Sequence, residues 1–207
     1  MPAGFTEQEK ERIKEGLIRE GRKLFSQYGL RKTTIKDITS AVGIAQGSFY
    51  NFYPSKEELY FEILDLESQK IRKNIGEKLD LIKDNPGAAL KKVIMESFMA
   101  LGENGLFKDL FSGNTYDILL RKLPEEKIKE HIMMDYASMK PLIVKWQNEG
   151  ILKKKSPEAI AGLLHVLFYI SLHKKEFGEN YRDIFELLLD LIVDGLVLEG
   201  KNNGLCY

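Results

Sequence analysis

Three polar side chains near the start of the chain could hold the phosphate groups of a nucleic acid. Thr34 stands where a helix should begin, and a helix N-terminus offers free N–H groups and a positive dipole end to an anion. Tyr50 adds a hydroxyl one turn into a second, short helix, and Lys56 adds a charge at the start of a third. Lys32 is a candidate for a further, long-range contact. Simpler roles stay open, with Thr34 as a cap only, Tyr50 as a core aromatic and Lys56 as a solvated charge.

The short helix before Lys56 carries side chains that could read base edges. The candidates are Gln46, Ser48 and Asn51, and Ala45 and Gly47 are small enough to permit close approach. Gln and Asn can pair bidentately with adenine, which gives roughly 1–3 kcal/mol of discrimination for each good contact. Gln46, at the exposed start of the helix, is the first choice, and Asn51 comes second because it can instead bond a phosphate. Gly47 has a competing role in tight packing of two helices.

The residues around these candidates predict a helix-turn-helix. Between Thr34 and Gly43 the apolar residues recur at three- and four-residue spacing, which puts them on one buried helical face. They are Ile35, Ile38, Ala41 and Val42. Asp37 can complete a capping box with Thr34, and Gly43 suits the left-handed residue that ends a helix. A second capping box, Ser55 with Glu58, begins the following helix. Two helices joined by such a turn match the DNA-binding motif whose second helix enters the major groove.

The composition of the 207-residue chain is that of an ordinary globular protein, with 43% hydrophobic and 30% charged residues. The formal net charge is zero, but residues 1–56 carry 10 basic against 6 acidic side chains, and the remainder carries 21 against 25. A basic N-terminal quarter on an acidic body favours a small DNA-binding head. The charged N-terminus lacks the apolar core of a secretory signal, and the single cysteine, Cys206, cannot form an internal disulfide. We therefore expect a cytoplasmic protein.

Apolar spacing of helical period dominates the whole chain, so the sequence predicts an all-α protein. The expected helices cover about residues 7–28, 34–43, 46–53, 56–81, 87–102, 105–112, 115–121, 125–148, 157–175 and 181–199. The last two are apolar on most sides, which is typical of buried helices. We expect a second copy of the chain to cover them in a four-helix bundle, and a monomer that buries both in its own core is the alternative. The interface residues predicted are Leu164, Phe168, Leu188, Leu191, Ile192 and Leu196.

Residues 95–146 are rich in methionine and aromatic side chains, which suit a pocket for an apolar or aromatic ligand. The candidates for its lining are Met95, Phe98, Met99, Phe111, Tyr116, Met133, Tyr136, Met139 and Trp146. Tyr116, Tyr136 and Trp146 would supply its polar groups. For any single one of these residues, an ordinary core position is the alternative.

An enzyme is the competing class, and its usual signatures are missing from the sequence. There is no glycine-rich phosphate loop and no GxSxG turn, and Cys206 is a poor candidate for a nucleophile. None of His131, His165 and His173 has another histidine three or four residues away, so no helical metal pair exists. His165 or His173 could lie in the dimer interface or be a satisfied core residue. We therefore expect no catalytic residue, no cofactor and no metal.

A set of residues between positions 10 and 65 has the order and spacing of a known family. The set is Gly29, Thr33-Thr34, Ile38, Ala41, Gly43-Ile44, Gly47, Phe49-Tyr50, Phe52 and Ser55-Lys56-Glu57-Glu58-Leu59. In these residues the chain resembles the TetR family of bacterial transcriptional regulators. Thr34, Tyr50 and Lys56 correspond to positions that contact phosphates in that family. Asn51 and Pro54 depart from the residues that are usual at their positions.

The resemblance implies a homodimer that sits on a palindromic operator, blocks transcription and releases the operator when a small molecule binds. It implies a three-helix DNA-binding head, residues 1–54, on a larger helical effector-binding and dimerisation domain, residues 55–207. The expected partners are double-stranded DNA, a second copy of the chain and a small apolar or aromatic effector, with no membrane. The alternative function is that of a helical small-molecule-binding or adaptor protein whose helix-turn-helix has lost DNA binding.

Overall fold

Helices make up every regular element in the part of the chain that the computed structural model describes, residues 5–80, 85–112 and 114–198. They are α1 (Glu7–Lys32), α2 (Ile35–Val42), η1 (Gln46–Asn51), α3 (Lys56–Asp80), α4 (Pro86–Glu103), α5 (Gly105–Ser112), α6 (Thr115–Lys122), α7 (Glu125–Asn148), α8 (Pro157–Leu172), α9 (Lys174–Phe177), η2 (Gly178–Asn180) and α10 (Tyr181–Leu196). The predicted all-α fold is therefore confirmed, and Cys206 lies outside the described residues. Among the described helices, none combines the length and the apolar character that crossing a membrane requires.

The contacts within the chain divide it into two compact units. Unit 1 comprises Met1–Lys70 with Leu101–Glu125, and unit 2 comprises Ile71–Ala100 with Glu126–Tyr207. Helix α3 therefore contributes residues to both units. The predicted boundary between residues 54 and 55 lies inside unit 1, between η1 and α3.

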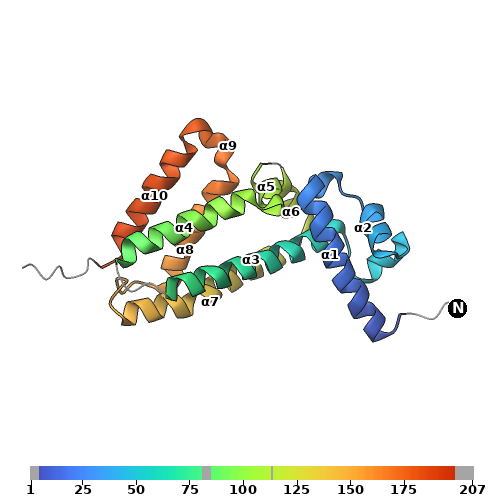
Figure 1. The fold of residues 1–207 in the computed structure, drawn as a ribbon, viewed down its shortest axis with the longest axis horizontal. Coiled ribbons are helices and arrows are strands. Elements are labelled where there is room, and N and C mark those ends of the chain that lie inside the picture. The colour runs from blue at the N-terminus through green and yellow to red at the C-terminus, as the bar shows by residue number, and fades with distance from the viewer. Residues whose placement is uncertain (1–4, 81–84, 113, 199–207) are drawn as a thin grey trace, which may run out of the picture. The chain divides into compact units, whose positions relative to one another are not determined.

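Unit 1 is built on α1, against which α2 and α5 pack (Figure 1). Its fully buried residues include Leu17, Phe25, Leu30, Ile38, Phe49, Leu59, Tyr60, Ile63, Leu106 and Phe107. Gly29 breaks the helical geometry of α1 with φ 77°, close to the predicted end of the first helix at residue 28. The prediction that Ala41 faces the core is wrong, because Ala41 is exposed; the buried side of α2 is formed by Ile38 and Thr39.

Unit 2 has a separate apolar core drawn from α4, α7, α8 and α10. The buried members are Leu90, Val93, Ile94, Ile143, Trp146, Leu152, Ile160, Ala161, Leu167, Phe185, Leu189, Ile192, Val193 and Leu196. Helices α8 and α10 pack against each other, and α9 with η2 forms the turn between them (Figure 1). As the sequence predicts, Ser156 caps α8 and Pro157 occupies its first turn, where a proline costs no hydrogen bond.

Candidate nucleic-acid interface

The start of α2 is a complete capping box, as the sequence predicts. The N–H of Asp37 donates to Thr34 Oγ1 at 3.1 Å, and the N–H of Thr34 donates to Asp37 Oδ2 at 2.9 Å. The Thr34 hydroxyl, which donates to Asp37 Oδ2 at 2.6 Å, and the N–H of Thr34 hold the pKa of the Asp37 carboxyl below its usual value. At a helix start, the N–H groups of Ile35 and Lys36 have no intrahelical acceptor, so they remain free for an anion.

The turn that joins α2 to η1 presents the candidate base-reading residues to solvent. Gly43 adopts the left-handed conformation, φ 81° and ψ 32°, and its N–H donates to Thr39 O at 2.9 Å. In η1, Phe49 is fully buried and fixes the orientation of the short helix. The candidates Ala45, Gln46, Gly47 and Asn51 are exposed, and Ser48 is partly exposed. Their side chains are thus accessible, whereas their contacts with bases stay a prediction.

Gly47 is not required for packing within this chain. A Cβ added to Gly47 would meet no heavy atom within 4 Å in the part of the chain that the structure describes. Its φ lies outside the left-handed region, so backbone strain does not demand glycine either. Of the two roles considered for Gly47, close approach to a partner is the one compatible with this environment.

Tyr50 is a surface residue, so its alternative role as a core aromatic is wrong. It is 57% exposed, and its ring makes an edge-on contact with Phe49 at 5.7 Å between centroids. This contact orients the ring while its hydroxyl remains accessible. Lys32 is also exposed.

Lys56 bonds the backbone at the C-terminal end of α1 and at Thr33, the residue that follows it. Its Nζ donates to Leu30 O at 2.7 Å and to Thr33 O at 2.8 Å, with Arg31 O at 3.5 Å. Both Leu30 and Thr33 are buried, so these carbonyls need an internal partner. Lys56 is therefore not merely a solvated charge, and its ammonium group lies beside the residue that precedes Thr34.

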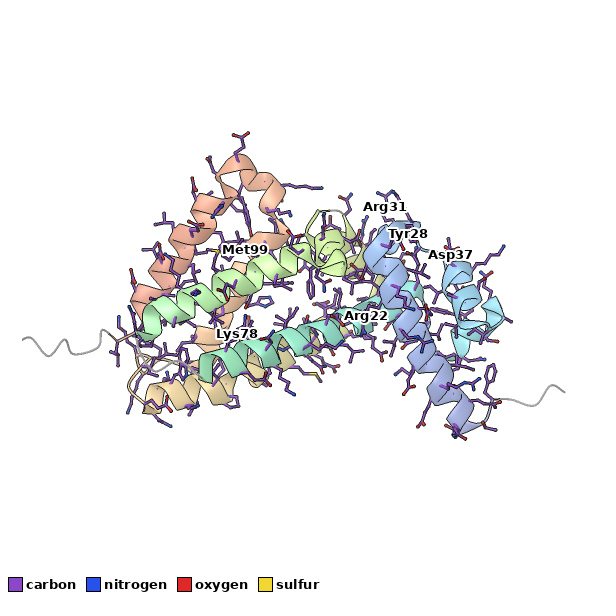
Figure 2. All side chains as sticks on the ribbon, viewed as in Figure 1. Arg22, Tyr28, Arg31, Asp37, Lys78 and Met99 are labelled. Atoms are coloured by element: carbon purple, nitrogen blue, oxygen red, sulfur yellow. The ribbon has the colours of Figure 1, made fainter. Side chains whose placement is uncertain are left out.

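A shallow groove of about 400 Å³ brings the predicted phosphate contacts together. It is lined by Thr34, Ile35, Gln46, Tyr50, Pro54, Ser55, Lys56 and Glu57. The lining includes the three main phosphate candidates and the first-choice base reader, which come from α2, η1 and α3. Lys32, Ser48 and Asn51 do not line it. Figure 2 shows Arg31 on α1 and Asp37 on α2, which flank Thr34 in the sequence.

The structure places five of the nine predicted effector-pocket residues against one core, that of unit 2. Trp146 belongs to this core, and Met95, Phe98, Tyr136 and Met139 pack against it. Two others, Met99 and Met133, are exposed by 63% and 65%, and Phe111 and Tyr116 belong to unit 1. These four are thus not among the residues that form or pack against the core of unit 2. The pocket itself stays a prediction.

The predicted dimer-interface residues separate into two sets. Ile192 and Leu196 are buried in the core of their own chain, so assigning them to a partner was wrong for this conformation. Leu164 and Leu188 are partly buried against the same core, Phe168 is also partly buried, and Leu191 is 63% exposed. Further exposed apolar residues, which the sequence did not single out, lie on the same two helices: Leu163, Val166 and Tyr169 on α8, and Ile184 and Leu187 on α10. Both faces of α8 and α10 are apolar, so the sequence alone cannot say which one faces the core.

A polar cluster that the sequence analysis did not single out lies in unit 2. Arg72 Nη1 and Asp135 Oδ1 are 2.6 Å apart, and His131 Nε2 lies 3.7 Å from Asp135 Oδ2. The His165 ring contacts Tyr136 edge-on at 5.7 Å, and burial lowers the pKa of His165, which keeps it neutral at pH 7. The spacing of His131 and Asp135, four residues apart on one helix, is the signal that could have indicated this pair.

Comparison with known proteins points to a single family. The family model for bacterial regulatory proteins of the tetR family matches residues 17–63. The HTH-type transcriptional regulator YerO of Bacillus subtilis is 38% identical over 91% of this chain and 67% of its own length. The crystal structure of a TetR-family transcriptional regulator from Pectobacterium atrosepticum covers 95% of this chain and 100% of its own, with a TM-score of 0.73 and 16% identity. The complex of SmeT with triclosan covers 91% of this chain and 93% of its own, with a TM-score of 0.61 and 21% identity; SmeT represses a multidrug efflux pump of Stenotrophomonas maltophilia.

Proposed function

Because this chain belongs to the TetR family of bacterial transcriptional regulators, we propose that it binds a palindromic operator as a homodimer and releases it when a small effector binds. In this proposal the protein acts in the bacterial cytoplasm as a repressor. Its relatives are transcriptional regulators and not enzymes.

The groove at the start of α2 is the observation that carries the DNA-binding part of the proposal. It joins a capped helix N-terminus, an exposed tyrosine and a lysine, which are three groups that bind phosphate oxygens. Gln46 lines the same groove and begins η1, so a phosphate held by Thr34 would set Gln46 against the neighbouring base edge. Affinity would come from Thr34, Tyr50 and Lys56, and base identity would come from Gln46, with Ser48 and Asn51 as further readers.

The homodimer is supported by the outward faces of α8 and α10. Leu187 and Leu191, one turn apart on α10, are 62% and 63% exposed, and Leu163, Val166 and Tyr169 are exposed at three-residue spacing on α8, which packs against α10. Contiguous exposed apolar surface marks an interaction site, and two such helix pairs close a four-helix bundle about a two-fold axis. The same symmetry would present two heads to the two halves of a palindrome.

The effector is proposed to be an apolar or aromatic small molecule. Support comes from the methionine and aromatic side chains that pack against the core of unit 2, and from the similarity to SmeT, whose complex holds triclosan. Tyr136 and His165 would contribute polar atoms beside these apolar groups.

Selection of bound duplexes from a random-sequence pool tests the proposal. We expect an inverted repeat with half-sites about 10 bp or a simple multiple apart, and an affinity that falls steeply with salt. The Gln46→Ala variant, selected in parallel, should lose preference at one base pair of each half-site. Weak binding with no enriched motif would overturn the proposal and favour a small-molecule-binding or adaptor protein that has lost DNA binding.

A further inference from the structure

The carboxylate of Asp109, on α5, is a hub of hydrogen bonds inside unit 1. Its Oδ2 accepts from the N–H of Leu30 at 3.0 Å and from the Thr115 hydroxyl at 2.9 Å. The Tyr60 hydroxyl lies 3.3 Å from the same oxygen and donates to Leu106 O at 2.9 Å. Leu30, Tyr60 and Thr115 are all buried and Asp109 is partly buried, so water competes less for these bonds than at the surface. One side chain of α5 thus joins α1, α3 and α6.

Both backbone polar groups of Leu30, its N–H and its carbonyl, are bonded by residues that are distant in the sequence. Its N–H is bonded by Asp109, 79 positions further along the chain, and its carbonyl is bonded by Lys56, 26 positions further along. Lys56 also bonds the carbonyl of Thr33, which precedes the Thr34 cap of α2. A continuous path of hydrogen bonds therefore leads from α5 to the helix start that we propose to hold a phosphate.

The contact between α1 and α5 leaves little room for movement. A Cβ at Gly29 would collide with the Asp109 carboxylate, and a Cβ at Gly105 would collide with the backbone carbonyl of Ser26. Gly29 also has φ 77°, which favours glycine. Two glycines thus allow α5 to approach the end of α1 that carries Leu30; Figure 2 shows Tyr28 and Arg31, the neighbours of this segment, on α1. A rigid contact of this kind transmits a displacement of one element to the other.

We propose that Asp109 is a positioning residue for DNA binding, which fixes the DNA-reading head on α5 and α6 through Leu30. The proposal rests on the proposed function, because it requires an operator with two half-sites. In this proposal Asp109 touches no base or phosphate; it fixes the head on α5 and α6 within unit 1, and we expect the half-site spacing that the dimer accepts to depend on this attachment. Base preference within a half-site is left to η1.

The test measures the affinity of the full-length protein for its selected inverted repeat and for versions with one base pair added or removed between the half-sites. Wild type should lose at least about tenfold in affinity on either change, because half-site spacing follows from the geometry of the dimer. Asp109→Ala should bind the selected repeat about 3- to 30-fold more weakly, the range expected for residues on a coupling path. When the spacing is changed, the affinity of Asp109→Ala should fall by about threefold or less. The half-site sequence that this variant selects should be the same as that of the wild type.

Two variants separate positioning from simple stabilisation. Asp109→Asn keeps an oxygen for the N–H of Leu30 and should restore most of the spacing discrimination. Tyr60→Phe removes a hydroxyl from the same buried cluster but leaves the bond between Asp109 and Leu30 intact, so it should keep the wild-type spacing profile. If the alanine variant does not fold, Asp109→Glu takes its place in the spacing measurement, because this substitution moves the carboxylate by one methylene.

Three outcomes would overturn the inference. Folded Asp109→Ala or Asp109→Glu with the wild-type spacing profile would remove the positioning role. Loss of discrimination in Tyr60→Phe equal to that in Asp109→Ala would reduce Asp109 to a stabilising residue. Failure of the wild-type protein to select any inverted repeat would instead remove the proposed function, and this inference with it.

Discussion

Replacing Lys56 by methionine separates two roles that the structure gives to one ammonium group. The substitution keeps the apolar stem and removes the donors to Leu30 O and Thr33 O. A hydrogen bond to a charged group contributes about 1.5–3 kcal/mol, but Lys56 is partly exposed and water can replace part of each bond. We therefore expect Lys56→Met to lower the free energy of unfolding by about 2 kcal/mol rather than by the sum of two full bonds.

The same substitution should also change the salt dependence of DNA binding. Nζ makes two short bonds, and its third N–H has only the longer contact with Arg31 O at 3.5 Å, which a phosphate oxygen can replace; the groove places that group beside Thr34 and Tyr50. If this N–H meets a phosphate, the slope of log affinity against log salt should shrink by about one, equally for all DNA sequences. Urea unfolding followed by circular dichroism measures the first effect, and titration of the operator at several salt concentrations measures the second.

The two readouts can contradict the reasoning independently. Unchanged stability in Lys56→Met would show that the carbonyl contacts of Lys56 contribute nothing, and an unchanged salt slope in the folded variant would remove Lys56 from the phosphate contacts. Lys92→Met is the matched control, because Lys92 is an exposed lysine on α4, in the other unit. It should alter neither quantity.

Three further predictions concern the cap, the base reader and the dimer. Thr34→Ala should cost about 1 kcal/mol through loss of the cap and weaken binding to all sequences alike. Because the Thr34 hydroxyl and N–H lower the pKa of Asp37, the stabilisation from the Asp37 carboxylate is complete above its unfolded pKa of about 4 and is lost as pH falls through the lower folded pKa. This acid dependence should shrink in Thr34→Ala unfolding curves, because the hydroxyl is removed and the N–H remains. Gln46→Ala should relax preference at one base pair by roughly 1–3 kcal/mol in competition binding, and the same uniform loss as in Lys56→Met would refute its base-reading role. The double variant Leu187→Glu with Leu191→Glu should have the mass of a monomer in light scattering, and a persistent dimer would place the interface elsewhere.

Local features of the head were predictable from the sequence because their partners lie within one helical turn. The capping box of Thr34 with Asp37 and the left-handed Gly43 depend on neighbours three to four residues away. Helical period likewise locates most helices to within a few residues. Ala41 shows the limit of this reasoning, since a small apolar residue fits the exposed side of a helix as readily as the buried side.

Features that depend on distant residues were not predictable in the same way. The two bonds from Lys56 to Leu30 and Thr33, at the end of α1, join residues 26 and 23 positions apart, and no periodicity encodes such a pair. The hub at Asp109 joins residues up to 79 positions apart. On α10, Leu191 and Ile192 are adjacent and both apolar, yet one is exposed and the other is buried, because packing and not composition selects the inner face.

The origin of each group in the interface predicts how its substitutions combine. The phosphate candidates come from three elements, and one of them, Lys56, bonds the carbonyl of Leu30 at the end of α1, whose N–H is bonded by Asp109. Substitutions at Lys56 and Asp109 should therefore be non-additive in DNA-binding free energy, since each removes a hydrogen bond of the same residue. Gln46 belongs to η1, which is oriented by the buried Phe49 rather than by the bonds of Leu30. Gln46→Ala combined with Asp109→Asn should then be additive, so that sequence preference and placement of the head vary independently in this protein.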